Sequence, residues 1–259
     1  MIYIQKHRTP DIVQRKVSEI INTPDSGYEF IRLPENTKQL RELFENMPKD
    51  EIRKELCKEQ HGLCAYCMRR IEPKRNSTQI EHYIALSVDK QKALDYQNYL
   101  GVCDGGKGNK KGRASVLCCE AVREEKGLTI NPRDKRQMEA IGYKRNGEIF
   151  VRRDSGLDPE LVDNMQKDLD EVLVLNGKKD ISGKIVFDTA TQLVAHRRSI
   201  YDSICTQFER WDKKKCLTKE FLKEKIEDLE KQLQGDRIAE PYIGVKLYFY
   251  KRKYKKLDR

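Results

Sequence analysis

The sequence predicts an α+β protein in which a small core, held together by a bound metal ion, lies between two helical extensions. Three observations lead to this prediction: paired cysteines in the middle of the chain, a β-hairpin signal after them, and helical apolar patterns on both sides. We expect three segments. Residues 1–50 are extended and helical and offer a possible docking surface, residues 51–135 hold the core, and residues 136–259 hold the hairpin, further helices and a basic aromatic end.

The first half of the chain has a helical signal on either side of a polar stretch. Residues 11–21 predict a short helix after an extended entry, and residues 36–61 predict a helical region that ends near Gly62. The stretch 104–113, DGGKGNKKGR, combines glycines with basic residues and predicts a loop.

The second half begins with a hairpin and continues with helices. Residues 141–151 alternate in the manner of strands, and Asn146-Gly147 is typical of a type I′ turn. Three helices are expected to follow: one that starts at Asp158-Pro159 and ends before Asn176-Gly177, one near 187–211 and one near 218–234.

Composition favours a partner rich in phosphate. Hydrophobic residues form 37% of the chain and charged residues 36%, which is polar for a globular protein but too apolar for a disordered one. The net charge is +10 and the pI about 9.1, and an excess of Lys and Arg favours polyanions. The same charge also fits a soluble protein that is merely basic.

The sequence predicts a cytoplasmic protein with no membrane partner. No apolar run approaches the roughly 18 to 20 residues that span a bilayer. The N-terminal stretch MIYIQKHRTP lacks the apolar core of a signal peptide. Eight cysteines in a reducing compartment are poor candidates for a disulfide framework, so their spacing is interpreted as metal binding.

The cysteine spacing predicts one structural Zn²⁺ ion. Cys64 and Cys67 form a Cys-x-x-Cys turn, which by itself also fits a redox pair or two buried thiols. Cys103 and the pair Cys118-Cys119 supply a second half of the site. Four thiolates would leave no ligand position open for water, so the zinc would be structural.

The fourth zinc ligand is either Cys118 or Cys119. We favour Cys119, because the acidic residue directly after it, Glu120, is then in position to serve as a ligand of a catalytic metal. Spacing alone leaves both alternatives open.

A Glu-His dipeptide between the two cysteine halves predicts hydrolytic chemistry. Glu81-His82 is followed by Asn98 and Glu120. A neutral imidazole takes a proton from water near pH 7, and an Asn side chain or a backbone carbonyl can orient it. The carboxylates of Glu81 and Glu120 suit Mg²⁺ or Mn²⁺ as a catalytic metal. This set fits metal-assisted phosphodiester cleavage.

These residues resemble the HNH, or ββα-metal, nucleases. In that family a strand ends in Asp/Glu-His, a loop carries Asn-Leu-x-x-x-Cys, and a helix opens with Cys-Asn/Asp-x-x-Lys. The matching stretches here are Glu81-His82, then Asn98-Tyr99-Leu100-Gly101-Val102-Cys103, then Cys119-Glu120-Ala121-Val122-Arg123. The resemblance implies that His82 is the general base, that Asn98 orients it, that Glu81 and Glu120 bind the catalytic metal, and that Arg123 meets phosphate.

Further segments are similar to the PtuB family, the HNH component of the Septu anti-phage system, which also occurs beside some retrons. These segments are residues 3–6, 63–71, 80–82 and 130–132. The resemblance implies an effector nuclease controlled by a PtuA-like ATPase and, in retron settings, a complex with a reverse transcriptase and its msDNA. The helices between 158 and 235 fit a docking surface, or they simply pack on the nuclease.

Two basic stretches are candidates for contact with nucleic acid. The first is the loop that contains Lys107, Lys110, Lys111 and Arg113. The second is the C-terminal run of Lys251, Arg252, Lys253, Lys255 and Lys256, where Tyr248, Tyr250 and Tyr254 would offer stacking surfaces. Such runs are also typical of solvated faces, and neither has a pattern that reads bases.

Two functions from different classes therefore remain. The first is an HNH endonuclease, with DNA as the default substrate and tRNA or other RNA as the alternative. The second is a non-catalytic zinc knuckle that binds nucleic acid or docks on an ATPase. The set of Glu81, His82, Asn98 and Glu120 separates them, because a binding knuckle has no need of it.

Overall fold

The protein is a mixed α+β molecule with small antiparallel sheets. The computed structural model describes residues 1–24, 26, 28, 37–108 and 116–257. The described helices are α1 (Asp11–Asn22), α2 (Thr37–Glu45), α3 (Lys49–Glu59), α4 (Glu120–Arg123), α5 (Lys135–Glu139), α6 (Pro159–Lys167), α7 (Leu193–Lys213), α8 (Lys219–Lys231) and α9 (Ile243–Lys256). Shorter helical turns are η2 (Lys90–Lys92), η3 (Tyr96–Asn98) and the π-type turn η4 (Asp168–Val172).

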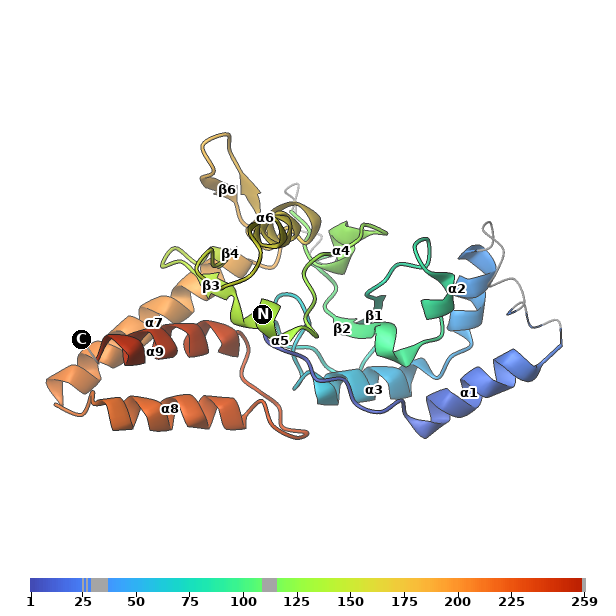
Figure 1. Ribbon diagram of the computed structural model, residues 1–259, viewed down its shortest axis with the longest axis horizontal. Coiled ribbons are helices and arrows are strands. Elements are labelled where there is room, and N and C mark those ends of the chain that lie inside the picture. The colour runs from blue at the N-terminus through green and yellow to red at the C-terminus, as the bar shows by residue number, and fades with distance from the viewer. Residues whose placement is uncertain (25, 27, 29–36, 109–115, 258–259) are drawn as a thin grey trace.

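The strands pair in three separate two-stranded sheets. They are β1 (Gln79–His82) with β2 (Tyr99–Val102), β3 (Ile141–Tyr143) with β4 (Ile149–Val151), and β5 (Lys178–Lys179) with β6 (Ile185–Phe187). Figure 1 shows an elongated molecule with α1 and α2 at one end, α7, α8 and α9 at the other, and the β1–β2 hairpin between them.

Two clusters of buried apolar side chains hold these elements together. The smaller cluster joins α1, α2 and α3 to the turns that precede β2. The larger one contains the clustered cysteines and extends through the β3–β4 hairpin to the helices from α6 to α9. Met1, Ile2 and Ile4 pack into the larger cluster. The segment expected as a unit at 1–50 is therefore divided between both clusters.

The helical region expected at 36–61 is present as two helices. Proline fixes its own φ angle and donates no backbone hydrogen bond, so it favours a helix start over a helix interior. Pro48 precedes α3 and separates it from α2, which ends at Glu45. This break allows α2 to pack beside the β1–β2 hairpin while α3 lies beneath it (Figure 1).

The β1–β2 hairpin is fixed to the end of α3. In its antiparallel register, His82 lies opposite Tyr99 and Glu81 opposite Leu100. The Gln60 side chain donates a hydrogen bond to the Gly101 carbonyl at 2.7 Å and accepts one from the Gly101 amide, also at 2.7 Å. This paired contact replaces a third strand at the edge of β2.

The β3–β4 hairpin lies where the sequence predicts it, but its turn is of another kind. A type I′ turn needs positive φ at both central residues, and only Gly147 has one, at 89°. The Gly147 amide bonds to the Lys144 carbonyl at 3.0 Å, and the Lys144 amide bonds to the Glu148 carbonyl at 2.8 Å. These bonds make a three-residue loop that ends in a left-handed glycine.

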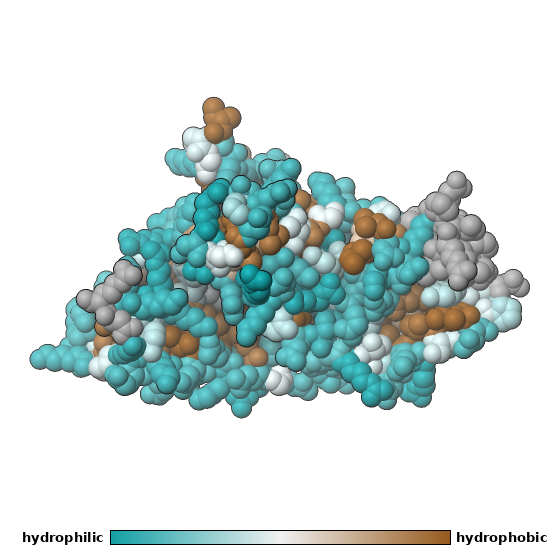
Figure 2. Space-filling view, in the orientation of Figure 1, coloured by the Kyte–Doolittle hydropathy of each residue, from teal (hydrophilic) through white to brown (hydrophobic). Residues whose placement is uncertain are grey.

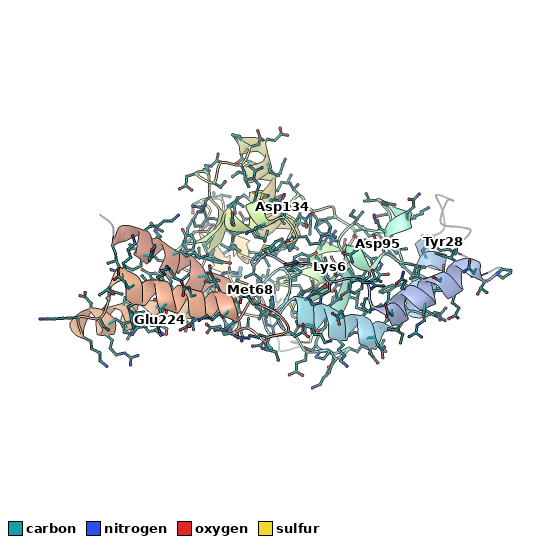
Figure 3. All side chains as sticks on the ribbon, turned by 60° about the horizontal axis from the view of Figure 1, so that its bottom comes forward. Lys6, Tyr28, Met68, Asp95, Asp134 and Glu224 are labelled. Carbon is teal, nitrogen blue, oxygen red and sulfur yellow. The ribbon has the colours of Figure 1, made fainter. Side chains whose placement is uncertain are left out.

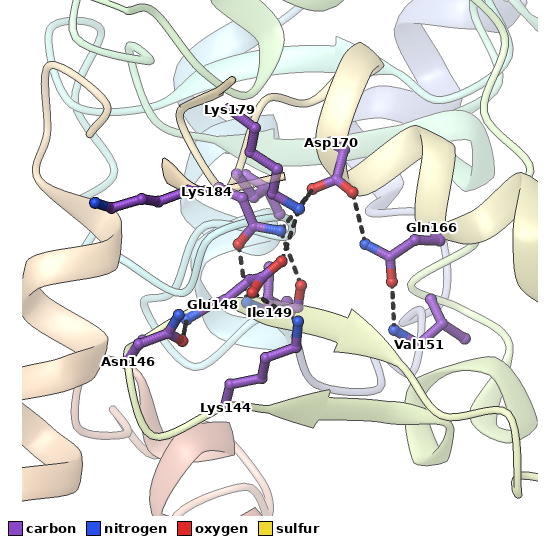
Figure 4. Close-up of polar contacts among 12 residues, drawn as sticks. Lys144, Asn146, Glu148, Ile149, Val151, Gln166, Asp170, Lys179 and Lys184 are labelled. Atoms are coloured by element: carbon purple, nitrogen blue, oxygen red, sulfur yellow. Dashed lines mark hydrogen bonds and ion pairs between the residues drawn. The ribbon is translucent and has the colours of Figure 1, made fainter. Parts of the chain in front are cut away.

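A charged cluster attaches β5 to the β3–β4 hairpin. Figure 4 shows Glu148 between Lys144 and Lys179, each 2.7 Å from one of its carboxylate oxygens. Lys179 also lies 2.9 Å from Asp170, in the turn that follows α6. Burial raises the pKa of Glu148, but the hydrogen bonds from both lysines outweigh burial and hold it below its usual value.

The helix expected near 187–211 begins later, as α7. Residues 185–187 form β6 instead, and Thr189 forms a parallel bridge with Val116. The Asp188 carboxylate then accepts hydrogen bonds from the amides of Val194 at 3.0 Å and Ala195 at 2.9 Å, which satisfies the start of the helix. No helix in the described part of the chain is both long and apolar enough to cross a membrane.

The basic C-terminal stretch is the helix α9, which lies beside α8 in two views (Figures 1 and 3). Tyr250 on this helix is 5% exposed, and its hydroxyl donates to Gln207 at 2.6 Å. The expectation that Tyr248, Tyr250 and Tyr254 all offer stacking surfaces is therefore wrong for Tyr250. One face of α9 packs into the larger cluster, and its lysines face outward.

The β5–β6 hairpin projects from the body of the molecule. Figure 2 shows apolar side chains at its tip. Ile181 in the connecting turn and Val186 and Phe187 on β6 are all exposed, with Phe187 at 64%. Apolar side chains grouped on a projecting element are typical of a contact surface.

Candidate metal centre and catalytic site

Four cysteines from three parts of the chain meet beside the β1–β2 hairpin. Cys64 and Cys67 belong to the turn after α3, Cys103 follows β2, and Cys119 precedes α4. All four are buried, and their sulfur atoms lie within 4.8 Å of one another. Among the described residues, this is the one group of three or more potential ligands close enough to share a metal ion.

The geometry of this cluster fits Zn²⁺. Tetrahedral zinc with Zn–S bonds of about 2.3 Å separates its sulfurs by about 3.8 Å, and the Cys67 and Cys103 sulfurs are 3.6 Å apart. The Cys103 amide points at the Cys64 sulfur from 3.3 Å, the contact that stabilises a metal-bound thiolate. The four residues can therefore hold a metal ion such as zinc.

Electrostatics around the cluster also suit a bound cation. Burial raises the pKa of Cys67 well above its usual value, and hydrogen bonding with Cys103 raises it further. Four buried thiols at this distance ionise together only when a cation compensates their charge. Burial lowers the pKa of Arg69, yet the adjacent Cys103 and Cys67 raise it overall. This guanidinium lies where it offsets the negative charge of a tetrathiolate centre.

The structure places Cys119, and not Cys118, in the cluster. Cys119 has a positive φ of 56°, so its side chain and that of Cys118 diverge. The Cys118 sulfur lies 3.6 Å from the Gly105 carbonyl and 3.5 Å from the Thr191 hydroxyl. Gly105 also has a positive φ, and a Cβ there would meet the Cys118 carbonyl oxygen at 2.1 Å.

The His82 ring is held in one orientation at the end of β1. Its Nε2 atom lies 2.9 Å from the Ala93 carbonyl oxygen. A carbonyl only accepts hydrogen bonds, so Nε2 carries the proton and Nδ1 of the neutral ring keeps its lone pair. The rings of Phe44 and Tyr99 pack edge-on against His82, at centroid distances of 4.7 and 5.0 Å.

The neutral form of His82 is favoured. Burial lowers the pKa of the ring, and the hydrogen bond to Ala93 opposes this only in part. The positive charges of Arg123, Arg41 and Lys49 lower it further. An unprotonated imidazole at neutral pH is what a proton acceptor requires.

Asn98 acts on the loop beside His82 and not on the ring, which differs from the expectation. Its side chain accepts a hydrogen bond from the Ile84 amide at 2.8 Å and donates one to the Ile84 carbonyl at 2.9 Å. It also donates to the Lys92 carbonyl at 3.3 Å. The loop from β1 to η2 is thereby closed, and the neighbouring Ala93 carbonyl is the group that orients His82.

Arg123 is buried and does not lie at a surface where it would meet phosphate, contrary to the expectation. It is 0% exposed and forms an ion pair with Glu81. It also donates to the Tyr66 hydroxyl at 3.1 Å, to the His82 carbonyl at 3.2 Å and to the Tyr83 carbonyl. Its donors are consumed within the protein, so Arg123 ties α4 to the end of β1.

Glu81 is a buried carboxylate with one oxygen already engaged. Its Oε1 atom takes the ion pair with Arg123 and a hydrogen bond from Tyr66 at 3.4 Å. Among the described residues, Oε2 has no hydrogen-bond partner. Burial raises the pKa of Glu81 to about 7, Arg123 opposes that rise, and the charge of Glu120 adds to it. The negative charge of Glu120 therefore disfavours ionisation of Glu81.

Glu120, the first residue of α4, is paired with a lysine. Lys107 lies 3.1 and 3.0 Å from its two carboxylate oxygens. The remaining predicted basic residues of this loop lie outside the described residues: Lys110, Lys111 and Arg113.

The chemistry of Glu81 and Glu120 suits a hard divalent cation. Mg²⁺ prefers carboxylate oxygens, often only one or two, and keeps several waters as its other ligands. A cation bound to Glu120 would compete with Lys107 for the same carboxylate. The two carboxylates alone do not form a complete protein ligand set.

Two residues near His82 were not anticipated from the sequence. Phe44 and Arg41 both come from α2, far from the Cys and Glu-His motifs in the chain. Arg41 forms an ion pair with Glu125, just after α4, and both side chains are about half exposed. Phe44 touches the His82 ring. An amphipathic helix gives no local signal that it will pack on a particular histidine.

A scan against models of known protein families and a search of curated proteins find no match to this chain.

Proposed function

We propose that this protein is a metal-dependent HNH endonuclease of the PtuB type that hydrolyses phosphodiester bonds in nucleic acid. The observation that carries the proposal is the setting of His82. Its ring is fixed through Nε2 by Ala93, its Nδ1 is unprotonated, and the charge of Glu120 acts on the adjacent Glu81 carboxylate. The order of β1, β2 and α4 around the cysteine cluster supports a ββα-metal unit.

In the proposed reaction, His82 Nδ1 takes a proton from the attacking water. The Ala93 carbonyl stabilises the imidazolium that results, because it accepts a hydrogen bond from the Nε2–H group. Phe44 and Tyr99 keep the ring from rotating. A general base of this kind contributes about 10²- to 10⁴-fold to a rate.

Glu81 Oε2 and Glu120 would hold the catalytic Mg²⁺ or Mn²⁺. When bound, such an ion neutralises charge on the phosphate and the leaving oxygen. With the ion bound, Glu120 would no longer pair with Lys107, and the Lys107 ammonium would be available to a substrate phosphate. Arg41, whose positive charge acts on His82, is the proposed phosphate contact in place of the buried Arg123.

The zinc held by Cys64, Cys67, Cys103 and Cys119 has a structural role in this proposal. Four thiolates leave no position for water or substrate. The ion would fix the turn after α3, the end of β2 and the start of α4 relative to one another, which are the elements that carry Glu81, His82 and Glu120.

DNA is the proposed substrate, with tRNA or other RNA as the alternative, because the same cleavage step serves both. The proposed controlling partner is a PtuA-like ATPase, and a reverse transcriptase with its msDNA is a further candidate in a retron setting. The exposed apolar side chains of the β5–β6 hairpin, Ile181, Val186 and Phe187, support a protein contact. Its strand continues into the Thr189 bridge to Val116, close before Cys119 and α4.

A non-catalytic zinc knuckle that binds nucleic acid or docks on an ATPase is the second candidate. One observation favours it: Arg123 already neutralises Glu81, and Lys107 already neutralises Glu120. Both carboxylates are thus satisfied without a metal ion. A non-catalytic protein would have no use for the unprotonated Nδ1 atom of His82, and this counts against the second candidate.

The test is cleavage of plasmid DNA and of total tRNA, side by side. Each substrate is incubated with the protein in Mg²⁺, Mn²⁺ or EDTA, with and without a PtuA-like ATPase. We expect cleavage that depends on the divalent ion, and the substrate that is cut decides between DNA and RNA. A zinc-loaded protein that binds both substrates and cuts neither under any condition would support the second candidate.

A further inference from the structure

A groove of about 660 Å³ lies beside α5, between the N-terminal stretch, the β3–β4 hairpin and α9. It is distinct from the candidate catalytic site, because none of His82, Glu81 and Glu120 lines it. Figure 1 shows these elements gathered around the N-terminus. Its size is within the range of about 300 to 1,000 Å³ that is usual for ligand sites.

The walls of the groove carry unpaired positive charge. Five basic and two acidic residues line it. Arg152 pairs with Asp154 at 3.6 Å, and Lys251 pairs with Glu230 at 2.6 Å. Within the described ranges, the other three cations have no ion-pair partner and are exposed: Lys135, Arg252 and Lys255. They come from two elements, α5 and α9, and converge on one hollow, which favours an anionic ligand.

Aromatic side chains line the same hollow. Tyr3 lies between the buried Ile2 and Ile4 and is itself 41% exposed. Tyr248 packs edge-on against Phe150, at a centroid distance of 6.4 Å, and both are partly exposed in the groove wall. Flat side chains beside unpaired cations provide surfaces for bases next to positions for phosphates.

We propose that this groove binds a short single-stranded segment of nucleic acid. Bases would stack on Tyr3 and Tyr248, and phosphates would contact Arg252, Lys255 and Lys135. A duplex keeps its bases inside and offers only its backbone, so aromatic groove walls favour a single strand. An acidic peptide would use the cations but leave the aromatic faces without a matching group. This inference deepens the proposed function and rests on nucleic acid being its substrate.

The groove is connected to the catalytic residues through the start of α5. Arg133 lies two residues before Lys135, and its guanidinium is 4.6 Å from the centre of the Tyr83 ring. Tyr83 directly follows His82. A strand that leaves the groove along α5 would therefore pass towards Tyr83, the residue after His82.

The test measures binding without cleavage, so that it is independent of the nuclease. The full-length, zinc-loaded His82→Ala protein is titrated without added Mg²⁺ or Mn²⁺ against a fluorescent single-stranded oligonucleotide. We expect the double change Arg252→Glu and Lys255→Glu to weaken binding at least tenfold. The matched control is Lys213→Glu with Lys214→Glu, two exposed lysines at the end of α7 that carry the same charge change; it should weaken binding less than threefold.

Tyr3→Ala is the second variant, because it removes stacking and leaves the net charge unchanged. We expect a loss of at least fivefold for a single strand and a smaller loss for the duplex of the same sequence. Zinc content and unfolding curves confirm that each variant is folded. Equal losses in the two double variants, no binding by the parent protein, or preference for an acidic peptide over the oligonucleotide would each overturn the proposal. Cleavage activity in the wild-type chain tests the nuclease separately.

Discussion

The buried pair of Arg123 and Glu81 determines how the candidate site is built. The guanidinium reaches Glu81, Tyr66 and the carbonyls of His82 and Tyr83 from a fully buried position. A charge in such a place is stable only while its partners remain, since the protein interior does not solvate an isolated ion. Arg123 therefore positions the end of β1, because it holds the Glu81 side chain and the backbone carbonyls of His82 and Tyr83.

Removal of the Arg123 charge is predicted to destabilise the protein strongly. Arg123→Met leaves Glu81 buried without a counter-ion, and the loss of one partner of a buried pair costs about 3 to 5 kcal/mol. Urea unfolding measures this free energy. Arg136→Met, an exposed arginine on α5, is the matched control and should change it by less than about 0.5 kcal/mol. Equal stability of the two variants would contradict the structural role of Arg123.

At the scale of single residues, the sequence predicts which side chains gather and not what each one contacts. The spacing of Cys64, Cys67 and Cys103 is sufficient to predict a shared site, because the ligands of one metal must meet. The role of Asn98 could not be predicted, since a side-chain amide serves a loop as readily as a ring. The hydrogen-bond partner of His82 is the Ala93 carbonyl. Every residue has a backbone carbonyl, so the amino-acid sequence does not indicate which one will bind the ring.

At the scale of elements, the turn before α4 selects the fourth metal ligand. The positive φ of Cys119 directs its sulfur to the cluster, while Cys118 faces Gly105 and Thr191. Adjacent cysteines thus have separate surroundings, although either would satisfy the spacing in the sequence.

Cys119→Ser is predicted to abolish stoichiometric zinc binding, and Cys118→Ser to retain it. The first change removes one of four thiolates, and the second removes a thiol that faces only a carbonyl and a hydroxyl. Zinc per chain, measured by metal analysis after dialysis, should fall from about one to well below one half in Cys119→Ser alone. Zinc loss in Cys118→Ser with retention in Cys119→Ser would reverse the assignment.

Element boundaries were predictable where local chemistry sets them. Residues 141–151 form a hairpin as expected, because Gly147 supplies the left-handed position that a tight loop needs. The turn type was wrong, since Asn146 keeps a negative φ. The predicted start of α7 was also too early. The Asp188 side chain binds the first amides of the helix from five residues before it begins, and the short strand β6 forms only because it pairs with residues 178–179. Such non-local contacts have no signature in a periodic pattern.

At the scale of the whole molecule, the larger apolar cluster makes the metal centre and the C-terminal helices one cooperative body. Cys64, Cys67 and Cys103 share that cluster with residues of α7, α8 and α9. Trp211, the single tryptophan of the chain, packs against this cluster and against Phe221 of α8, at a ring-centroid distance of 5.0 Å.

Zinc release and tryptophan fluorescence are predicted to change at the same urea concentration. One cooperative transition gives coincident curves for probes in different places. Trp211 reports on the helical end, and a chromogenic chelator reports on the cysteines. Midpoints that differ by more than about 0.5 M, with zinc released first, would show that the metal centre unfolds separately and would contradict a shared core.

The most direct test of the proposed nuclease is a comparison of two histidine variants in one cleavage assay. His82 is the fixed, half-buried ring at the end of β1, and His196 is an exposed histidine on α7. The account predicts that His82→Ala lowers the metal-dependent cleavage rate by about 10²-fold or more while the protein stays folded and keeps its zinc, and that His196→Ala cleaves like the wild type. Cleavage at the wild-type rate by a folded, zinc-loaded His82→Ala protein would contradict it.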